Sequence, residues 1–594
     1  MNSKHIIGIM LAIVVIGAYS VFAAGPVFAA GGTGEQQNNT TILNVTASPR
    51  GGNFNDSVTV SLTSTGGKDP VRTFFTTDGT LPTNASTVYT APLTFNRSTI
   101  LRFFSQEGSG RPTPLFNETF NIYHQVAYTY SVRVPVTRWV RRRFRVRGRW
   151  RSRWVRVRRH ITEHRTGQRG ERSAFNGLPQ AENNVIFFHP DGYGLSHWDA
   201  LRTKTVGPDG RLNWDKLPYT ASYTGHMKDQ LTGTSHGGAT THAYGVKVVA
   251  DSFGLDGGRP ITALSGKNMS IMEEAIRAGF ATALIQTGSI TEPGTAAFVT
   301  SVEERGNHTE IARQVIESGV DIILSGGERW LLPAGVTGRH GVGTRTDDLN
   351  LIARAEELGY TVVYTRDELL ALPRTTTRVL GVFAHWHTFN DMTEEALRAA
   401  GLPLYVPTAP TIDEMSNVAL EILSHIGRPF FMVAEEEGTD NFPNAANAAG
   451  SFEAGRRADA AFAIFREFVR HNPRTMLLTA ADSSAGSKNI VRVLPVGATV
   501  VGIGPVNTGP DGRTVHAPFD GVDGAGTAPF VSAPDRKDIK FPFAVAWASM
   551  HDLAGDILAR AKGLNAYRVR KMGIVDNTDI YRLMYLTLFG RWLA

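Results

Sequence analysis

From residue 183 to the C-terminal end, short apolar runs alternate with longer stretches in which apolar residues recur every three or four positions. The short runs predict strands and the long ones helices, because side chains repeat every two residues in a strand and every 3.6 in a helix. The predicted strands are residues 185–188, 281–286, 321–324, 379–383, 430–433 and 476–478. The predicted helices are residues 270–278, 309–318, 412–425 and 452–471. This alternation is typical of βαβ units, so an α/β domain with a mainly parallel sheet is expected over residues 181–594.

A different pattern covers residues 42–125, where apolar and polar residues alternate in short runs separated by turn residues. Residues 57–62 and 99–104 are examples, and their spacing predicts a small all-β sandwich. The stretch Phe-Phe-Thr-Thr-Asp-Gly-Thr-Leu-Pro-Thr at 74–83 resembles the chitobiase/β-hexosaminidase C-terminal-type module, an accessory domain of secreted bacterial enzymes. It contains no catalytic constellation, and both a spacer role and glycan binding are left open.

Arginine dominates the segment that follows, residues 126–180, which we expect to be extended. Residues 133–159 hold 13 arginines and no acid, and the rest of the chain has 48 basic against 54 acidic residues. Between Arg143 and Arg158 arginine alternates with Phe, Trp and Val, which predicts a ribbon with guanidinium groups on one face and aromatic rings on the other. Such a ribbon fits an anionic envelope polymer, while a solvated basic linker is the alternative and nucleic acid is disfavoured.

The N-terminus has the pattern of a secretory signal. Lys4 and His5 precede an apolar run from residue 6 to 24, followed by small residues up to Ala30. Residues 1–30 are thus a cleaved signal peptide or a retained anchor, and 31–41 a Gly/Asn/Thr-rich linker, so the protein is expected to be exported to the periplasm, the cell envelope or the extracellular space. The 594-residue chain is long enough for several domains, and its lack of Cys excludes disulfides, thiolate metal sites and a Cys nucleophile.

Three predicted strands of the large domain run directly into carboxylates. Asp191 follows the first, Glu435 and Asp440 follow the fifth, and Asp482 follows the sixth. In open α/β sheets the carboxyl ends of strands form the ligand site. Acids that converge there repel one another unless a cation lies between them, so the spacing predicts a site for hard divalent metals.

A further candidate is the segment Thr234-Ser235-His236-Gly237-Gly238, which opens a predicted helix. A hydroxyl at a helix start lies where backbone N–H groups hold anions, and beside a metal it can attack a phosphoryl group. The alternative is that Ser235 or Thr234 only caps the helix.

These motifs, in this order, resemble the alkaline phosphatase superfamily over residues 183–594. The resemblance implies a three-layer sandwich fold, a Ser nucleophile at Ser235, a phosphate-binding Arg at Arg305, and zinc and magnesium ions. It places Asp191 between a zinc and the magnesium, Thr295 and Glu435 on the magnesium, and Asp440 and Asp482 on zinc ions. A homodimer is also left open.

The chain departs from the family where the family has histidines. Asn444 and Ser483 stand at two expected zinc ligands, and a third near the C-terminus has no counterpart that can be placed. Zinc favours imidazole, whereas an all-oxygen set favours Mg²⁺, Ca²⁺ or Mn²⁺. His189, His236, His385 and His387 are alternative ligands or structural residues, and Glu436 and Glu437 are alternatives to Glu435.

The function expected from this resemblance is an exported, metal-dependent phosphate monoester hydrolase that acts through a phosphoserine. The alternatives are a relative that cleaves phosphodiesters or sulfate esters, and a non-catalytic protein of the cell envelope. The expected partners are a phosphate ester substrate and, for residues 42–172, an anionic envelope polymer or a glycan.

Overall fold

The computed structural model describes residues 43–67, 70–77, 82–108, 110, 112–113, 116–146, 149–172, 183–373, 375–492 and 519–593. The predicted signal or anchor (1–30), the linker (31–41) and part of the 74–83 motif lie outside these residues. Within the described ranges, we find no helix with the length and hydropathy needed to span a bilayer.

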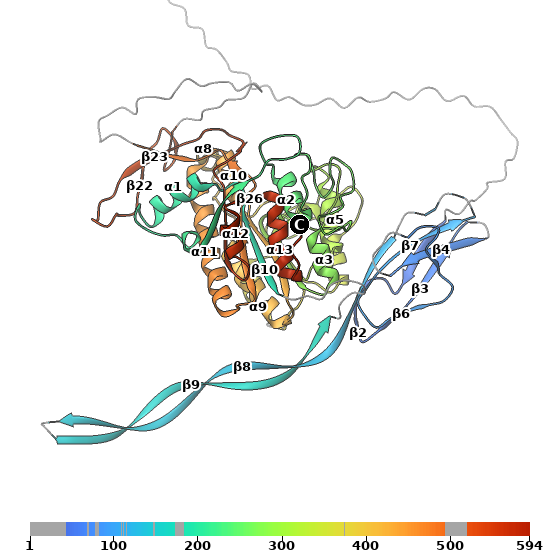
Figure 1. The fold of residues 1–594 in the computed structure, drawn as a ribbon, viewed down its shortest axis with the longest axis horizontal. Coiled ribbons are helices and arrows are strands. Elements are labelled where there is room, and N and C mark those ends of the chain that lie inside the picture. The colour runs from blue at the N-terminus through green and yellow to red at the C-terminus, as the bar shows by residue number, and fades with distance from the viewer. Residues whose placement is uncertain are drawn as a thin grey trace, which may run out of the picture.

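A ten-stranded sheet forms the centre of the large domain (Figure 1). Its strands lie side by side in the order β14 (Thr361–Val363), β15 (Val379–Val382), β13 (Ile322–Gly326), β12 (Ala281–Ser289), β16 (Phe430–Glu436), β10 (Asn184–Pro190), β17 (Thr475–Thr479), β25 (Leu558–Gly563), β11 (Tyr219–Thr224) and β26 (Ile574–Asp576). All neighbours from β14 to β17 are parallel, whereas β25 runs antiparallel to β17 and β11. The six predicted strands are therefore confirmed, together with the mainly parallel sheet.

Helices cover both faces of this sheet. One layer consists of α2 (Ser235–Tyr244), α3 (Ile271–Arg277), α5 (His308–Glu317), α6 (Leu351–Glu357), α12 (Tyr567–Met572) and α13 (Asn577–Phe589). The other consists of α1 (Leu195–Thr205), α7 (Arg366–Leu370), α9 (Ile412–Ile426) and α11 (Ala448–His471). Successive residues of β10 alternate between the layers, since Val185 and Phe187 pack in the first core and Ile186 and Phe188 in the second. This arrangement is the predicted three-layer α/β sandwich.

The predicted helices also form, with small differences at their ends. The largest difference is at α11, which begins at Ala448, four residues before the predicted start. Asn447 caps this helix, because its side chain accepts a hydrogen bond from the backbone N–H of Gly450 at 2.6 Å.

The N-terminal β-rich region contains two small sheets around its own core. One sheet contains β1 (Asn44–Ser48), β3 (Val58–Thr65) and β6 (Leu93–Phe95). The other contains β2 (Gly52–Asn55), β8 (Phe116–Val146), β7 (Thr99–Glu107), β4 (Val71–Thr76) and β5 (Thr87–Val88). The core between them includes Val45, Val60, Leu101, Phe103 and Phe120. This packing of two sheets is the expected all-β sandwich.

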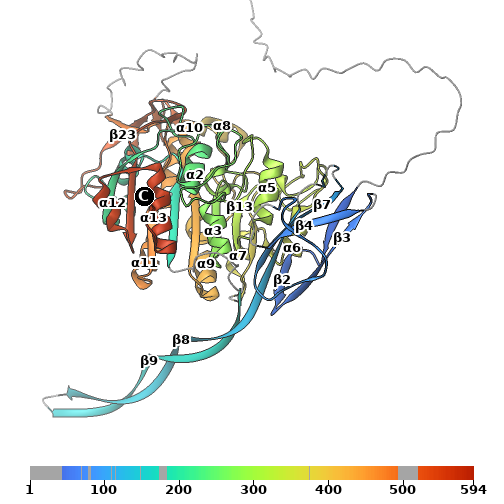
Figure 2. The same cartoon turned by 45° about the vertical axis from the view of Figure 1, so that its right-hand side comes forward.

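Strand β8 continues beyond the sandwich and pairs with β9 (Arg149–Arg172) in a long twisted ribbon that extends away from both domains (Figures 1 and 2). The described part of the arginine-rich segment is therefore in β-strands, and residues 147–148 and 173–180 of the expected extended segment lie outside the described residues. The predicted separation of arginine and aromatic positions is wrong, because the register pairs Arg145 with Trp150 and Arg142 with Arg153. Opposite positions share a face, so the two strands together place arginines on both faces.

Candidate active site

The carboxyl ends of three adjacent parallel strands bring the predicted acids together. Strand β10 lies between β16 and β17 and pairs with both in parallel. Asp191, Glu435 and Asp482 therefore emerge at one edge of the sheet, where all three are at most 1% exposed. Asp440 joins them from α10 (Gly438–Asn444), packed so closely on Gly192 that a Cβ there would lie 2.5 Å from its Oδ1 atom.

His189 bridges two of these carboxylates. Its Nε2 atom lies 3.2 Å from Asp191 Oδ1 and 3.5 Å from Asp482 Oδ1, and the imidazole is buried. Burial disfavours the charged imidazole, but the two carboxylates outweigh it and raise the pKa of His189. Burial and the charge of Asp191 raise the pKa of Asp482, whereas contacts with Asp482 and His189 hold the pKa of Asp191 low despite its burial.

Two glutamates bring further oxygen atoms to this cluster. Both carboxylate oxygens of Glu435 and the Oε2 atom of Glu437 are buried without a hydrogen-bond donor. Oxygen or nitrogen atoms of His189, Asp191 and Glu435 lie within 4.8 Å of one another, as do those of Asp191, Glu437 and Asp440. Burial and neighbouring carboxylates raise the pKa of both glutamates.

Next to Asp440, the cluster also contains the amide of Asn444 and one more acid, Asp552. The Nδ2 atom of Asn444 donates to both oxygens of Asp440, at 3.1 and 3.0 Å, and to Asp552 Oδ1 at 3.3 Å. Asp552 belongs to β24 (Asp552–Leu553), which pairs with β18 (Ser484–Ala485) directly after Asp482 and Ser483. Burial and the nearby Asp191 raise the pKa of Asp552.

Ser235 is the first residue of α2 and is 6% exposed. Thr234 caps the helix, because its Oγ1 atom accepts a hydrogen bond from the backbone N–H of Gly237 at 3.1 Å. The Ser235 hydroxyl lies beside the Asp191 carboxylate and contributes to its low pKa. Gly238 lets the helix approach the acids, since a Cβ there would lie 2.6 Å from the Cβ of Asp482.

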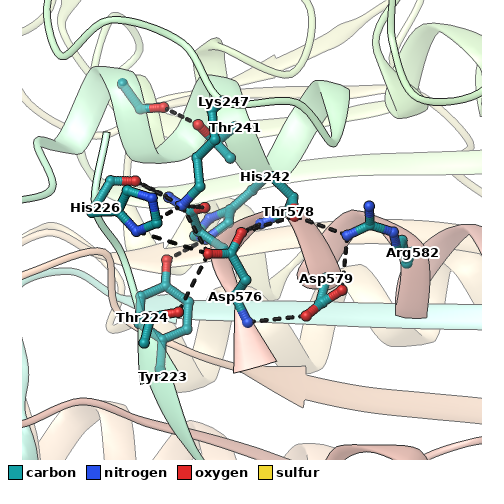
Figure 3. Close-up of polar contacts among 12 residues, drawn as sticks. Tyr223, Thr224, His226, Thr241, His242, Lys247, Asp576, Thr578, Asp579 and Arg582 are labelled. Carbon is teal, nitrogen blue, oxygen red and sulfur yellow. Dashed lines mark hydrogen bonds and ion pairs between the residues drawn. The ribbon is translucent and has the colours of Figure 1, made fainter. Parts of the chain in front are cut away.

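Polar contacts at the C-terminal end of α2 hold this helix in place (Figure 3). The buried His242 has its Nε2 atom 2.8 Å from the hydroxyl of Tyr223, on β11. Lys247, just after the helix, donates to the carbonyl of His226 at 2.7 Å and pairs with Asp576 at 2.8 Å. These contacts tie α2 to β11, β26 and the start of α13, so the position of Ser235 is set by both ends of its helix.

Thr295 and Arg305 approach from the next part of the chain. Thr295 lies in α4 (Pro293–Ala296) and accepts a hydrogen bond from Gln286 at 2.6 Å, and Gln286 is the register partner of Glu435. Arg305 donates through Nη2 to Glu292 at 2.9 Å, with its side chain 41% exposed. Charges of Glu292, Glu437 and Asp440 raise the pKa of Arg305 despite its desolvation. The guanidinium therefore lies at the solvent side of the acidic cluster.

Other candidates from the sequence make contacts elsewhere. His236 binds Asp251 at 2.9 Å, His385 contacts the Val342 carbonyl at 3.0 Å, and Glu436 binds Thr287 and Tyr405, both at 2.9 Å. His387 contacts the backbone N–H of Ser289 at 3.1 Å and lies 3.9 Å from Glu292.

Sequence reasoning missed Asp552 and Glu292 and gave Glu437 only as an alternative. The pairing that brings Asp552 to the site joins segments more than 60 residues apart, and the sequence drew attention only to the neighbouring His551, one of two histidines beyond Asp482. Glu292 had a signal, because it lies close before the Thr295 motif and can pair with the arginine predicted to bind phosphate.

The side chains at this edge suit divalent cations. The site brings together six carboxylates, and those of Glu435 and Glu437 offer buried oxygens that no donor satisfies. Unpaired buried charge is costly, and hard cations are bound by such oxygens. The oxygen-rich set with one imidazole, His189, therefore fits divalent metal ions.

The family of the large domain follows from comparison with known proteins. Residues 182–589 match the alkaline phosphatase family, and residues 49–117 match the chitobiase/beta-hexosaminidase C-terminal domain. The chain belongs to the alkaline phosphatase family, as the motifs predicted, and this membership implies divalent metal ions and a phosphate ester substrate.

The relatives are distant. An alkaline phosphatase of Escherichia fergusonii is 26% identical over 358 residues, which cover 53% of this chain and 72% of that protein. The streptomycin-6-phosphate phosphatase of Streptomyces griseus is 25% identical over 444 residues, or 68% and 90% of the two chains. The crystal structure of Thermus thermophilus alkaline phosphatase matches with a TM-score of 0.53 and 21% identity, covering 71% of this chain and 94% of that one. The structural likeness supports the fold.

Proposed function

We propose that this protein is an exported, metal-dependent phosphate monoester hydrolase that acts through a phosphoserine at Ser235. The single observation that supports this most is the position of the Ser235 hydroxyl, at the start of α2 and beside Asp191, inside a buried cluster of carboxylates. The family and the phosphatase relatives agree with this class of reaction.

The metal ions would be held by Asp191, Glu435, Asp440 and Asp482. Thr295 lies near Glu435, because Gln286 donates a hydrogen bond to Thr295 and is the register partner of Glu435. His189 and Glu437 would provide further ligand atoms, beyond the metal ligands that the family resemblance implies. Bound divalent cations would supply the positive charge that stabilises a serine alkoxide and the departing oxygen.

The chain's own residues account for the covalent steps. The Ser235 hydroxyl gives its proton to water and its Oγ atom attacks phosphorus, while the bond from phosphorus to the ester oxygen breaks. The departing oxygen takes a proton from water, and the alcohol leaves. A second water molecule then attacks the phosphoserine and loses a proton to solvent, the bond from phosphorus to Oγ breaks, Oγ takes a proton from water, and inorganic phosphate departs.

Arg305 would bind the phosphoryl group. A guanidinium can donate two parallel hydrogen bonds to two phosphate oxygens. Glu292 holds Arg305 at 2.9 Å on the solvent side of the cluster, which limits the freedom that the guanidinium would lose on binding substrate. The backbone N–H groups at the start of α2 add positive potential at the same place.

The proposal extends to the β8–β9 ribbon as a means of attachment to an anionic polymer of the cell envelope. Arg141, Arg143, Arg145, Arg149 and Arg153 are exposed near its tip. Arginines two residues apart on a strand are about 6.6–6.8 Å apart, a spacing that suits a repeating anion. A ribbon that projects from the folded domains can reach such a polymer while the catalytic domain remains free (Figure 2).

Two variants test the catalytic proposal. We expect Ser235→Ala to lower aryl-phosphate turnover on the order of 10³-fold or more, while bound metal by elemental analysis stays at the wild-type level. The control is Ser196→Ala in α1, which removes a hydroxyl that contacts Asp556 and not Asp191. Unchanged turnover in Ser235→Ala, or no turnover of the metal-loaded wild type on any phosphate ester, would contradict the proposal.

A further inference from the structure

A cleft of about 860 Å³ lies between the β-sandwich and the helices α3, α5 and α6 of the large domain. The sandwich is seen beside α5 and α6 in Figure 2. None of the acids of the candidate active site lines this cleft. Small-molecule sites in proteins usually measure about 300–1,000 Å³, so the cleft has the size of a ligand pocket.

Arg277, the last residue of α3, lines the cleft with a guanidinium group that has no protein partner. It is 5% exposed, and within the described part of the chain no hydrogen bond or ion pair reaches its side chain. None of its guanidinium nitrogens is fully enclosed, so the charged end of the side chain faces the cleft. A largely buried charge without a counter-charge is costly, and an anion bound in the cleft would offset that cost.

The acids closest to Arg277 along α3 and α5 are engaged by other groups. Glu273 lies one turn before Arg277, but its carboxylate accepts a hydrogen bond from the backbone N–H of Ser270 at 2.8 Å in a capping box. Glu317, which also lines the cleft, pairs with Arg313 at 2.6 Å. The positive charge of Arg277 is therefore available to a ligand.

The β-sandwich contributes a further cation and a carboxyl group of raised pKa to the cleft. Arg50 lines the cleft and is exposed. Glu118, on β8, accepts a hydrogen bond from the backbone N–H of Gly51 at 2.7 Å, and burial raises the pKa of its carboxyl group. A raised pKa favours the neutral form, so Glu118 repels an anion less than an ordinary glutamate does.

Apolar side chains of both domains also line the cleft. Phe103 and Phe116 of the sandwich stack with their ring centroids 5.6 Å apart, and Phe116 is only partly buried. Ile276 and Val299 contribute from the large domain. A ligand that fills this space therefore needs an apolar or aromatic portion as well as an anionic group.

We infer that this cleft binds a small organic anion, whose carboxylate or phosphate group contacts Arg277 and whose apolar portion lies against Phe116. A guanidinium can donate two parallel hydrogen bonds to either group, so both anions are recognised in the same way. The inference gives the β-sandwich a binding role, because one wall of the site belongs to it. The site is separate from the catalytic centre and does not depend on the proposed phosphatase activity.

The test is a titration of the full chain with 4-fluorobenzoate and with 4-fluorophenylphosphonate, followed by fluorine NMR. We expect at least one of these anions to bind, and Arg277→Gln to weaken its binding about tenfold or more because the bidentate contact is lost. The neutral 4-fluorobenzyl alcohol should bind more weakly than the anion. Tighter binding of the benzoate assigns a carboxylate ligand to the cleft, and tighter binding of the phosphonate assigns a phosphate ligand.

The matched control is Arg305→Gln, which removes the guanidinium of the candidate active site and should leave binding in the cleft unchanged. If Arg277→Gln fails to fold, Ala353→Trp gives a second test, because Ala353 is exposed on α6 and its replacement by an indole should block the cleft. The inference is overturned if neither anion binds, if the neutral probe binds equally well, or if the folded cleft variant keeps wild-type affinity. Binding that is lost in Arg305→Gln and kept in Arg277→Gln would place the probe in the catalytic centre and would also overturn it.

Discussion

Gly294 packs against the carboxylate of Glu435 so closely that a Cβ atom at position 294 would lie 1.6 Å from Oε1. Real Cβ atoms do not approach another heavy atom to this distance, so any side chain at 294 must displace the glutamate. Glu435 is fully buried and both of its oxygens lack a donor. The absence of a side chain at position 294 therefore fixes where a proposed metal ligand lies.

Gly294→Ala is expected to disrupt the metal centre without unfolding the domain. The added methyl group would push Glu435 away from Asp191 and His189, so we expect the bound metal to fall by about one equivalent and turnover to drop on the order of tenfold to 100-fold. The control is Gly306→Ala, where a Cβ meets nothing within 4 Å. Equal metal content in the two variants, measured by elemental analysis, would contradict this prediction.

Arg305 is expected to act on phosphate binding more than on metal binding. Its guanidinium adjoins the acidic cluster but is held by Glu292, so Arg305→Ala should leave the bound metal unchanged. We expect kcat/KM for an aryl phosphate to fall about 10²- to 10³-fold, and Arg305→Lys to recover only part of it because an ammonium group lacks the bidentate geometry.

The control for this pair is Arg313→Ala, since Arg313 is bound to Glu310 and Glu317 on α5 and makes no contact with the acids of the site. Inhibition by inorganic phosphate gives a second readout. If phosphate inhibits Arg305→Ala as strongly as wild type, Arg305 is not the residue that binds the phosphoryl group.

The ribbon gives a prediction that is separate from catalysis. Replacing Arg141, Arg143 and Arg145 with Gln should weaken binding to long-chain polyphosphate, a simple phosphate polymer, and reduce the slope of log affinity against log salt concentration by about 0.7–0.9 per arginine in contact. Turnover of a small aryl phosphate should not change, because these residues lie on the ribbon and not in the catalytic domain.

A triple variant of Arg366, Arg470 and Arg536 to Gln removes the same charge from exposed positions elsewhere and is the matched control. Equal loss of polyphosphate binding in both triple variants would show that net charge, and not the ribbon, is responsible.

Local patterns in the sequence were enough to predict the sheet and the acids at its edge. Val185 and Phe187 lie in a short apolar run, and such a run predicts a strand without any knowledge of the rest of the chain. The carboxyl ends of parallel strands lie at the same edge of the sheet, whatever the order of the strands in the chain. Asp191, Glu435 and Asp482 therefore meet where they were expected. Their roles as ligands remain a prediction.

Contacts between distant segments could not be predicted in this way. Asp552 reaches Asp440 only because β24 pairs with β18, and pairing between strands depends on tertiary packing that no local pattern encodes. The same reason explains the error in the ribbon, where the alternation on one strand is correct but its partner places Trp150 opposite Arg145.

The last prediction concerns pH and a carboxyl group outside the active site. Asp520, in β20 (Asp520–Gly521), is 3% exposed and accepts a hydrogen bond from the indole N–H of Trp547. Burial raises the pKa of Asp520 from 3.8 to about 7. Because the folded-state pKa is the higher one, the stability linked to this group is present in full below about pH 3.8 and is lost as the pH rises through 7.

Asp520→Asn should remove this pH dependence, since an amide keeps an oxygen for Trp547 and never ionises. We expect the melting temperature of the variant to exceed that of wild type by a few degrees at pH 8 and by roughly a degree or less at pH 5. Asp535→Asn, at an exposed turn that caps Lys537 and Ile539, serves as the control and should show no such difference between the two pH values. If Asp520→Asn changes the melting temperature equally at pH 5 and pH 8, the carboxyl group does not titrate in this range. The hydrogen bond to Trp547 alone would then offset the cost of burying Asp520.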